Sequence, residues 1–505
     1  MQGTRLAFHS PTWRGWTIST LVALVAILGV IGTSSFSAMA ASSAANTHIT
    51  ISGNKSLGVI PATSIGINNA VWDGGLLNSD LPGLLSNAGI KIMRYPGGST
   101  SDVYHWQTNT TEAGQSYANP SNTFDAFMGV AQKVGASPMI TVNYGSGTPA
   151  EAAGWVQYAN ITKHYGIKYW EIGNELYGNG TYGSNWEYDL HTQKNATAYA
   201  ENALQFIQAM KAIDPTIKIG VVLTVPGDWP DNIIASGDIG DWNHTVLSIL
   251  GTNVDFADQH WYADDVAPGS ESDPVLLRNA AQAIPEKVAA TRAELVQYAG
   301  NKGAAMPIMI TETNSVPYNP GKQTVSLVGA LFLATDYMNW LENGITNVDW
   351  WATHNGMVTN GNNSASLYGT TQYGDYGILS SGSTSDTLSE PPADTPFPTY
   401  YGLQQVHNLI GNGGIALANT SDQSLVEAHV VRHLDGSVAV MLINKDPSNS
   451  YSVALSTRGV SLGKNATVYT YGEDSTAVSV QQEDGLTASS PTLAPYSITT
   501  IVFHS

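Results

Sequence analysis

Short apolar runs alternate with longer segments of helical periodicity for more than three hundred residues from position 64 onward. The short runs are rich in β-branched and aromatic residues, which is typical of buried strands. They predict eight strands, at residues 64–68, 91–95, 138–143, 168–173, 217–222, 254–260, 307–311 and 347–351. Apolar residues every three or four positions predict the helices. These cover residues 80–87, 123–134, 148–166, 197–213, 241–250, 274–298, 325–341 and 400–409.

The third predicted helix has the clearest start signal in the chain. Thr148 suits the N-cap, Pro149 fits the first helical position, and Glu151 completes a Thr-x-x-Glu capping box. Gly166 ends the segment. A proline disrupts a helix interior, so we expect a break near Pro285 in the segment 274–298.

Eight strand-then-helix units predict an α/β fold with a closed (β/α)8 barrel. Such barrels hold their active site at the C-terminal ends of the strands. Polar residues can simply mark where a strand stops, and for one strand alone that is the simpler interpretation. Their presence at seven of the eight strand ends favours a polar site there. They are Asn68, Arg94, Asn143, Asn174, Glu175, His260, Glu312 and His354.

The pattern changes after residue 410. Segments 424–432 and 437–444 alternate apolar and polar residues around Asp435-Gly436, a hairpin turn signal. Short strands without a helix signal follow, which predicts a C-terminal antiparallel β-sandwich over residues 411–505. We expect this domain to support the barrel; binding of carbohydrate through exposed aromatics such as Tyr469 and Tyr471 is the alternative.

These patterns divide the chain into four regions. Residues 1–40 read as a signal peptide, 41–60 as a linker and strand that joins the sandwich near His48, 61–410 as the catalytic barrel, and 411–505 as the sandwich. The segment 360–396, rich in Ser, Thr and Gly, is expected to form a long loop over the barrel mouth.

Secretion is predicted from the N-terminal segment. Arg5 and Arg14 precede an apolar run over residues 18–31, and the small residues that follow end in Ala38-Met39-Ala40, an A-x-A cleavage pattern. The run is short for a membrane span, so an uncleaved anchor is the less favoured interpretation.

Composition narrows the possible partners. The 505 residues carry a formal net charge of −20, which argues against nucleic acid and anionic membrane surfaces, since both require clustered Lys and Arg. No cysteine is present, so disulfides and thiolate metal sites are excluded. Abundant Gly, Ser, Thr and Asn suit a hydroxyl-rich partner, and we expect an oligo- or polysaccharide substrate, no cofactor and no membrane contact after cleavage.

Two predicted strands end in a glutamate, namely Glu175 and Glu312. Strands four and seven of an eight-stranded barrel face each other across its mouth. Hydrolysis of a glycosidic bond with retention needs two carboxyl groups about 5–5.5 Å apart. By strand order we assign Glu175 as the acid/base and Glu312 as the nucleophile.

Neighbouring side chains are candidates for substrate binding. Asn174 can bond a sugar hydroxyl next to the reacting carbon. Arg94 and either His260 or Tyr262 can orient the nucleophile and keep it ionised. Trp350 and Trp351 can offer ring faces to sugars. The full set of substrate-binding candidates is Asn68, Arg94, Asn143, Asn174, His260, Tyr262 and Trp351.

Three runs invite a comparison. They are Arg-Tyr-Pro-Gly-Gly from Arg94, Asn-Tyr-Gly-Ser-Gly-Thr-Pro-Ala-Glu-Ala-Ala-Gly-Trp-Val-Gln-Tyr-Ala-Asn from Asn143, and Tyr-Trp-Glu-Ile-Gly-Asn-Glu from Tyr169. These runs resemble glycoside hydrolase family 51, mainly α-L-arabinofuranosidases of clan A. The resemblance implies the same barrel-plus-sandwich layout and a retaining mechanism. It gives Glu175 and Glu312 the same roles as the geometric argument, with Arg94, Asn174 and Tyr262 as active-site neighbours.

Three departures bear on specificity. The family usually has a glutamate after strand one, where this chain has Ile67-Asn-Asn-Ala70. It usually has Asn where Ser99 stands, and its nucleophile usually lies in Asp-Glu-Trp-Asn, here Thr311-Glu-Thr-Asn314. The two catalytic glutamates are retained, whereas the residues that grip the sugar differ.

Alternatives therefore stay open beside a secreted α-L-arabinofuranosidase acting on plant polysaccharide. Another clan A glycosidase (β-xylosidase, β-glucuronidase, endoglucanase or xyloglucanase) is one, and a non-catalytic carbohydrate-binding protein is another. A metal site at His260 and His354 is disfavoured, because neither has a paired ligand at metal spacing. Trp186, Trp229 and Trp242 are as compatible with packing as with outer subsites.

Overall fold

A computed structural model describes residues 44–264 and 269–505. The predicted signal peptide, residues 1–40, lies outside the described residues. None of the helices in the described ranges has the length and apolar character needed to cross a membrane.

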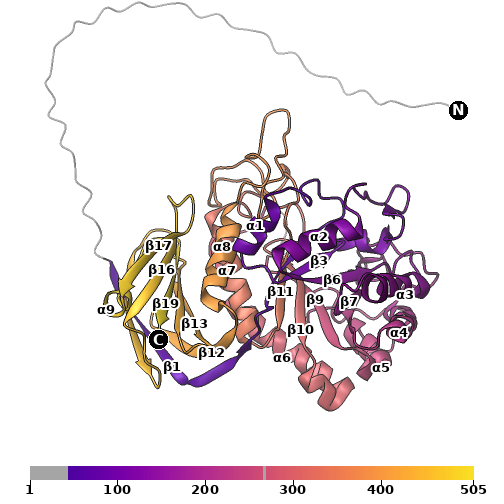
Figure 1. Ribbon diagram of the computed structural model, residues 1–505, viewed down its shortest axis with the longest axis horizontal. Coiled ribbons are helices and arrows are strands. Elements are labelled where there is room, and N and C mark those ends of the chain that lie inside the picture. Colours follow the sequence, from indigo (N-terminus) through magenta and orange to yellow (C-terminus); the bar gives the residue numbers. More distant parts are fainter. Residues whose placement is uncertain (1–43, 265–268) are drawn as a thin grey trace, which may run out of the picture. The chain divides into compact units, whose positions relative to one another are not determined.

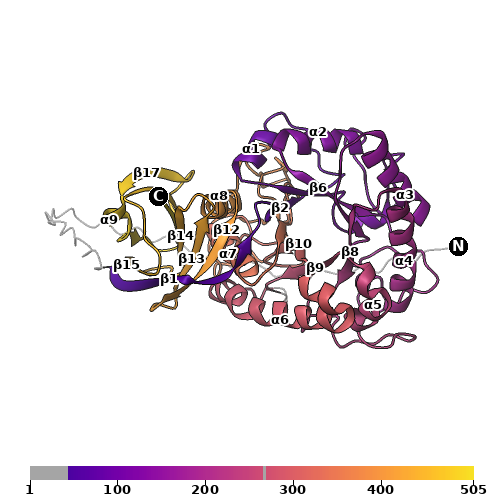
Figure 2. The ribbon, with the colours of Figure 1, turned by 60° about the horizontal axis from the view of Figure 1, so that its bottom comes forward.

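Eight parallel strands form a closed barrel in the order β10-β11-β2-β3-β6-β7-β8-β9. Figure 2 shows the barrel strands within a ring of helices. Each predicted barrel strand is present, which confirms the (β/α)8 fold. The strands are β2 (Ile65–Asn68), β3 (Ile92–Tyr95), β6 (Ser137–Val142), β7 (Tyr169–Ile172), β8 (Lys218–Leu223), β9 (Phe256–Tyr262), β10 (Ile308–Asn314) and β11 (Asn347–Trp350).

Eight helices cover the barrel. They are α1 (Leu81–Asn87), α2 (Phe124–Val134), α3 (Pro149–Val156), α4 (Ala196–Ile213), α5 (Trp242–Leu250), α6 (Asp273–Ala305), α7 (Leu327–Glu342) and α8 (Pro398–Ile410). The Thr148 hydroxyl accepts the backbone N–H of Glu151 at 3.1 Å, so the predicted start of α3 is confirmed. The expected break at Pro285 is wrong: the non-helical residue inside α6 is Gly300, with φ 55°, a value that glycine adopts without strain.

The second domain is built on one nine-stranded sheet, in the order β17-β16-β19-β14-β13-β12-β1-β15-β18. Strand β1 (Ala45–Ile60), predicted near His48, pairs antiparallel with β12 (Gly414–Ser421) and parallel with β15 (Tyr451–Arg458). The remaining strands are β13 (Val426–His433), β14 (Val438–Asn444), β16 (Asn465–Tyr471), β17 (Ser479–Asp484), β18 (Thr492–Leu493) and β19 (Ser497–His504). Figure 1 shows β1 beside the C-terminal strands. A one-turn helix that the sequence did not predict, α9 (Gly485–Ala488), begins where the Asp484 carboxylate caps it.

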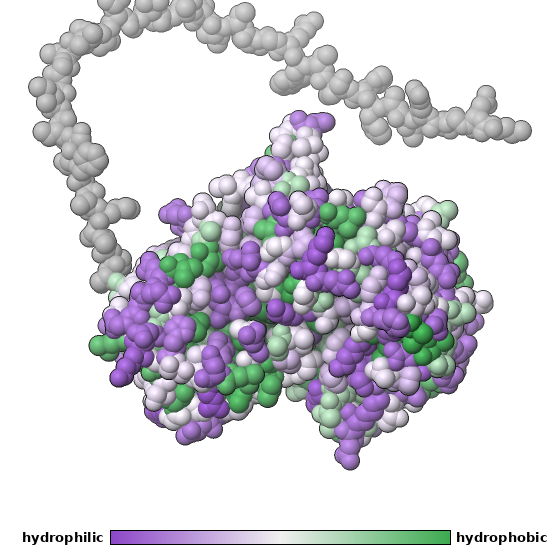
Figure 3. Space-filling view, in the orientation of Figure 1, coloured by the Kyte–Doolittle hydropathy of each residue, from purple (hydrophilic) through white to green (hydrophobic). Residues whose placement is uncertain are grey.

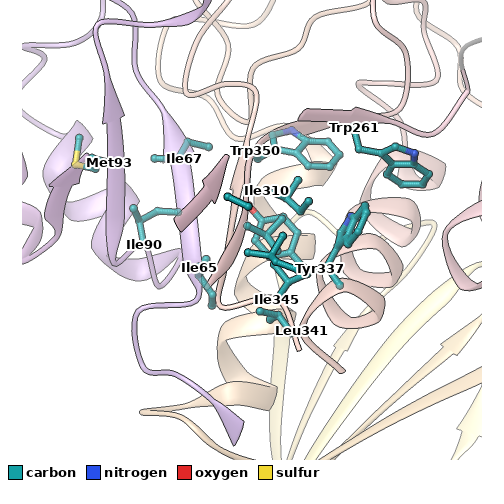
Figure 4. Close-up of a cluster of buried hydrophobic side chains, with 14 of the residues drawn as sticks. Ile65, Ile67, Ile90, Met93, Trp261, Ile310, Tyr337, Leu341, Ile345 and Trp350 are labelled. Atoms are coloured by element: carbon teal, nitrogen blue, oxygen red, sulfur yellow. The ribbon is translucent and has the colours of Figure 1, made fainter. Parts of the chain in front are cut away.

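Helix α7 is buried along almost its whole length, because it lies between barrel and sheet. Its residues Tyr337 and Leu341 pack with Ile65, Ile310 and Trp350 of the barrel wall (Figure 4). Trp350 therefore belongs to the core and is 1% exposed, so the idea that it offers a ring face to sugars is wrong. Tyr471 is also buried, against Tyr401 of α8, so it is not an exposed binding aromatic.

Candidate active site

A cavity of about 570 Å³ opens at the C-terminal ends of the barrel strands. Glu175 follows β7 and Glu312 lies near the end of β10, and both line this cavity. The strand order places β7 and β10 three positions apart, across the barrel mouth. Four further predicted residues line the same cavity: Asn174, His260, Tyr262 and Trp351.

The two glutamate carboxylates lie close together. One oxygen of Glu175, one oxygen of Glu312 and one ring nitrogen of His260 all lie within 4.8 Å of one another. This separation is of the order that retaining glycosidases use, about 5–5.5 Å.

Glu312 is held on both oxygens. The Tyr262 hydroxyl donates to Oε1 at 2.5 Å, and Nη1 of Arg94 donates to Oε2 at 3.1 Å. Two donors, one of them a cation, stabilise the carboxylate form of this side chain.

Arg94 lies beneath the cavity and is fully buried. Its Nε donates to Glu171 at 2.7 Å, its Nη1 to Asn68 at 2.9 Å, and its Nη2 to Oδ1 of Asn174 at 2.9 Å. The amide of Asn174 is thereby oriented with its nitrogen away from the guanidinium.

Glu175 is held differently. Nδ1 of His260 lies 2.9 Å from Oε1, and the Tyr177 hydroxyl donates to the same oxygen at 3.1 Å. The indole N–H of Trp186 donates to Oε2 at 2.9 Å.

The protonation of the pair follows from these contacts. Burial raises the pKa of Glu312, and the negative charge of Glu175 adds to that rise against the opposing effect of His260 and Arg94. Burial also works to raise the pKa of Glu175, but the hydrogen bond and charge of His260 outweigh it and the pKa is lowered. Burial lowers and the two glutamates raise the pKa of His260, with a net value of about 9. In the free site, His260 is therefore protonated and the neighbouring Glu175 is ionised.

Proteins with similar sequences include α-L-arabinofuranosidases. No protein-family model matches the chain. A segment of 176 residues is 31% identical to a probable α-L-arabinofuranosidase C of Aspergillus fumigatus, covering 30% of this chain and 33% of that protein. Another match, 27% over 178 residues, is an intracellular exo-α-L-arabinofuranosidase of Bacteroides ovatus, covering 26% of this chain and 34% of that protein. The matched part spans about a third of the length of these relatives.

Solved structures agree on the fold. The α-L-arabinofuranosidase of Thermotoga maritima superposes with a TM-score of 0.67 and 20% identity, covering 90% of this chain and 99% of that chain. A family 44 xyloglucanase of Paenibacillus polymyxa gives 0.63 and 11%, covering 92% and 100%. The chain resembles α-L-arabinofuranosidases. The likeness suggested by the three sequence runs is thus confirmed, as is the barrel with an added β domain.

Three predicted substrate contacts lie outside the cavity lining. Asn68 accepts from Arg94 and donates to the Thr311 carbonyl, so it braces the barrel floor. Asn143 accepts the backbone N–H groups of Ser146 and Gly147 and shapes the loop before α3. Arg94 reaches the site through Glu312 and Asn174. Direct sugar contact by Asn68, Asn143 and Arg94 stays a prediction.

Sequence reasoning left several cavity residues out. Trp186 and Trp229, which were not assigned, line the cavity, whereas Trp242 is buried in the core. Tyr376 comes from the long loop after β11, where the sequence predicted a cover over the mouth. Alternation along β7 could have found Glu171, which lies two residues from Gly173 and four from Glu175 on the inward side of the strand.

A metal is one further possibility at this site. Within the described ranges, the one group of three acidic or histidine side chains that approach closely enough to hold an ion is Glu175, His260 and Glu312. Their ligand atoms are engaged with one another or with Arg94, Tyr262, Tyr177 and Trp186. His354 lies elsewhere, between Asp73 at 2.9 Å and Asp394 at 3.0 Å.

Proposed function

We propose that the protein is a secreted glycoside hydrolase that releases α-L-arabinofuranosyl residues from plant polysaccharide by double displacement. The observation that carries the mechanism is the approach of the Glu175 and Glu312 carboxylates to within 4.8 Å in one cavity. The names of the sequence relatives support the arabinofuranosyl specificity.

In the first step, a carboxylate oxygen of Glu312 attacks the anomeric carbon. The bond from this carbon to the leaving oxygen breaks, and that oxygen receives a proton from Glu175, to which His260 has passed the proton that it holds in the free site. The product is a glycosyl ester of Glu312 and a free leaving group. Arg94 and Tyr262 favour the ionised form of Glu312 that this attack requires.

In the second step, Glu175 takes a proton from a water molecule, and the water oxygen attacks the anomeric carbon. The ester bond breaks and Glu312 is regenerated as a carboxylate. Two inversions give net retention. One amide hydrogen of Asn174 is bound to Glu187 at 2.8 Å, and the other remains for the hydroxyl next to the reacting carbon.

Hydrolysis of a panel of nitrophenyl glycosides tests this proposal. The panel contains the α-L-arabinofuranoside, β-xyloside, β-glucoside, β-glucuronide and β-galactofuranoside. We expect the arabinofuranoside to be cleaved, and Glu175→Ala and Glu312→Ala to lose most of that activity. Cleavage of another glycoside would keep the mechanism and replace the sugar. If both variants keep their activity, the mechanism is overturned. Binding of polysaccharide without any cleavage would favour a carbohydrate-binding protein.

A further inference from the structure

Two indole rings form an exposed shelf at the edge of the cavity. Trp186 and Trp229 lie with ring centroids 5.2 Å apart, and both line the cavity beside Glu175. They are 45% and 36% exposed, although large aromatic side chains usually find cover. Tyr177 supports both rings edge-on from below, at 6.2 and 5.9 Å. We call Trp186 and Trp229 the indole pair.

The position of Trp186 is fixed by its own loop. Its backbone N–H donates to the Gly178 carbonyl at 2.8 Å, and its ring lies directly on Gly178. A Cβ at residue 178 would meet the ring at 2.4 Å, so the glycine is what allows this close approach. These contacts orient the indole towards Glu175, while 45% of the side chain stays exposed.

The hydrogen bond from Trp186 to Glu175 occupies the second oxygen of the acid/base. Oε1 faces His260 and Tyr177, while Oε2 accepts the indole N–H at 2.9 Å. A glycosidic oxygen that is to receive a proton from Glu175 must reach one of these oxygens. Oε2 lies on the side of the indole pair, where a leaving group would extend from the cavity.

Flat ring faces beside an acid/base suit a particular ligand. A pyranose ring has an apolar face that can lie on an indole and hydroxyls at its rim that stay in water, as amphipathic aromatic sites require. The leaving group of a polysaccharide side chain is such a ring, since it belongs to the main chain. This step rests on the proposed function.

We propose that the indole pair binds the leaving-group sugar ring, and that the bound sugar displaces the Trp186 indole N–H from Oε2 of Glu175. The carboxylate is held in its ionised form while this site is empty. It becomes a proton donor when the leaving group takes the place of the indole and the proton of His260 passes to Glu175. Cleavage is thereby coupled to occupation of the leaving-group site.

The charges around Glu175 are consistent with such a coupling. Burial favours the neutral form, and the hydrogen bonds from His260, Trp186 and Tyr177 oppose it, so removal of the indole donor raises the pKa of Glu175. The other titratable groups whose pKa is affected by Glu175 include Glu312, Glu187, Tyr262 and Tyr376, and Asp228 and Tyr318 also line the cavity. None of them is changed in the test variant.

The test variant is Trp186→Phe, which keeps a ring face and removes the N–H. The substrates are an arabinofuranosylated xylo-oligosaccharide and methyl α-L-arabinofuranoside, whose leaving group has no ring. The pH profile of kcat/KM reports the free enzyme and that of kcat the enzyme–substrate complex. We expect the alkaline limb of kcat/KM to move to higher pH in the variant, because a Glu175 without the indole donor is more basic and the proton that it shares with His260 is lost at higher pH. On the oligosaccharide, the alkaline limb of kcat should coincide with that of the parent.

A second variant, Trp229→Ala, tests the shelf itself. We expect its KM for the oligosaccharide to rise about fivefold to tenfold more than its KM for the methyl glycoside, as the loss of one stacked ring predicts. The matched control is Tyr117→Ala, which removes an exposed aromatic outside this cavity.

Three outcomes would overturn the inference. They are unchanged limbs in Trp186→Phe, equal movement of the kcat/KM and kcat limbs, and equal losses of Trp229→Ala on both substrates. Inactivity of the parent on every arabinofuranoside would instead remove the proposed function. The same variants are then assayed on the glycoside that the parent does cleave. If it cleaves none, calorimetric titration with xylohexaose decides, with weaker binding by Trp229→Ala expected and equal binding contradicting the shelf.

Discussion

At the scale of single residues, the site is organised by Arg94. This one guanidinium contacts Asn68, Glu171, Asn174 and Glu312, all buried. A buried cation without a partner would be costly, and these contacts compensate it. The same contacts fix Glu312, the proposed nucleophile, and orient the amide of Asn174, so a single side chain connects the barrel floor with the proposed catalytic residues.

The hydroxyl of Tyr262 offers the most direct test of how Glu312 is kept ionised. We predict that Tyr262→Phe raises the pKa of Glu312, because a donor to the carboxylate is lost. Since attack requires the ionised form, the acid limb of kcat/KM moves to higher pH and kcat falls by roughly 10–100-fold. Stopped assays between acidic and neutral pH measure both. An acid limb identical to that of the parent would show that Tyr262 does not act on Glu312.

Glu187 fixes the sugar-facing amide from the other side. Its Oε1 accepts from Ser99 at 2.7 Å and from Asn174 at 2.8 Å. Burial, with the charges of Asp102 and Glu175, raises the pKa of Glu187 and so favours its neutral form. Ser99 stands where the resembled family has Asn. In this chain it is linked to the Asn174 amide through the carboxyl group of Glu187.

Two substitutions of Glu187 distinguish its hydrogen bonding to Ser99 and Asn174 from any effect of its charge. We predict that Glu187→Gln, which keeps the amide-like shape of a protonated carboxyl, retains most of the activity. Glu187→Ala leaves two buried groups unpaired and lowers kcat/KM by roughly tenfold or more. Steady-state assays on nitrophenyl α-L-arabinofuranoside measure the difference. Equal losses in the two variants would mean that the negative charge itself is required.

The sequence predicted the two glutamates that lie together in the cavity but not all of the residues around them. Glu175 and Glu312 could be found because each ends a recognisable strand. Trp186 lies in an irregular loop, and no periodicity there indicates which side of the loop faces the cavity. For Asn143 the pattern is ambiguous, since an Asn at a strand end serves the local turn as well as it serves a ligand.

At the scale of elements, the barrel and the sheet are joined by a buried ionic cluster. Lys445, after β14, pairs with Glu427 of β13 and donates to the Leu277 carbonyl of α6 at 2.6 Å. His429 of β13 lies between Glu427 at 3.2 Å and Glu342 of α7 at 3.1 Å. The contacts of this cluster support a role of the second domain as a brace for the barrel.

Removal of the lysine should destabilise the protein strongly. Lys445→Met leaves the partly buried Glu427 beside one fewer cation, and we predict a loss of about 2 kcal/mol in the free energy of unfolding, between the values for exposed and for buried pairs. Denaturant titration followed by tryptophan fluorescence measures it, with the exposed Lys464→Met as the control. A change as small as that of the control would show that the cluster does not hold the two domains together.

Element boundaries were predictable to within a few residues because strands and helices alternate so regularly. Helices α3 and α6 were the exceptions, since α3 ends at Val156 where the sequence predicted a helix up to Gly166. Pro285 suggested a break that the structure places instead at Gly300, where a positive φ is required. The parallel pairing of β1 with β15 could not be read from the sequence, since alternation fixes which face is buried but not the neighbouring strand.

At the scale of the whole molecule, stability should depend on pH through the same cluster. Burial lowers and the charges of Glu342 and Glu427 raise the pKa of His429, to about 10 in the folded protein. Its unfolded value is about 6.5, so its stabilisation is complete below about 6.5 and is lost as pH rises towards 10. We predict that Tm falls over this range and falls less in His429→Gln. Calorimetry at several pH values measures both; parallel curves would contradict the assignment.

The second prediction at this scale concerns cleavage of the N-terminal segment. If residues 1–40 are a signal peptide, protein recovered from the culture medium of a secreting host begins at Ala41. Intact-mass measurement determines the first residue. A cell-associated product that retains the apolar run at residues 18–31 would instead indicate an uncleaved anchor.

The central claim is that Glu312 forms a glycosyl ester which Glu175 then helps to hydrolyse. Mass spectrometry of Glu175→Ala, quenched during turnover of dinitrophenyl α-L-arabinofuranoside, tests it most directly. The activated leaving group makes the first step independent of the acid, and the missing base slows the second, so the intermediate should accumulate. We predict an arabinosyl adduct on the peptide that contains Glu312. Turnover without an adduct, or an adduct on another residue, would contradict the account.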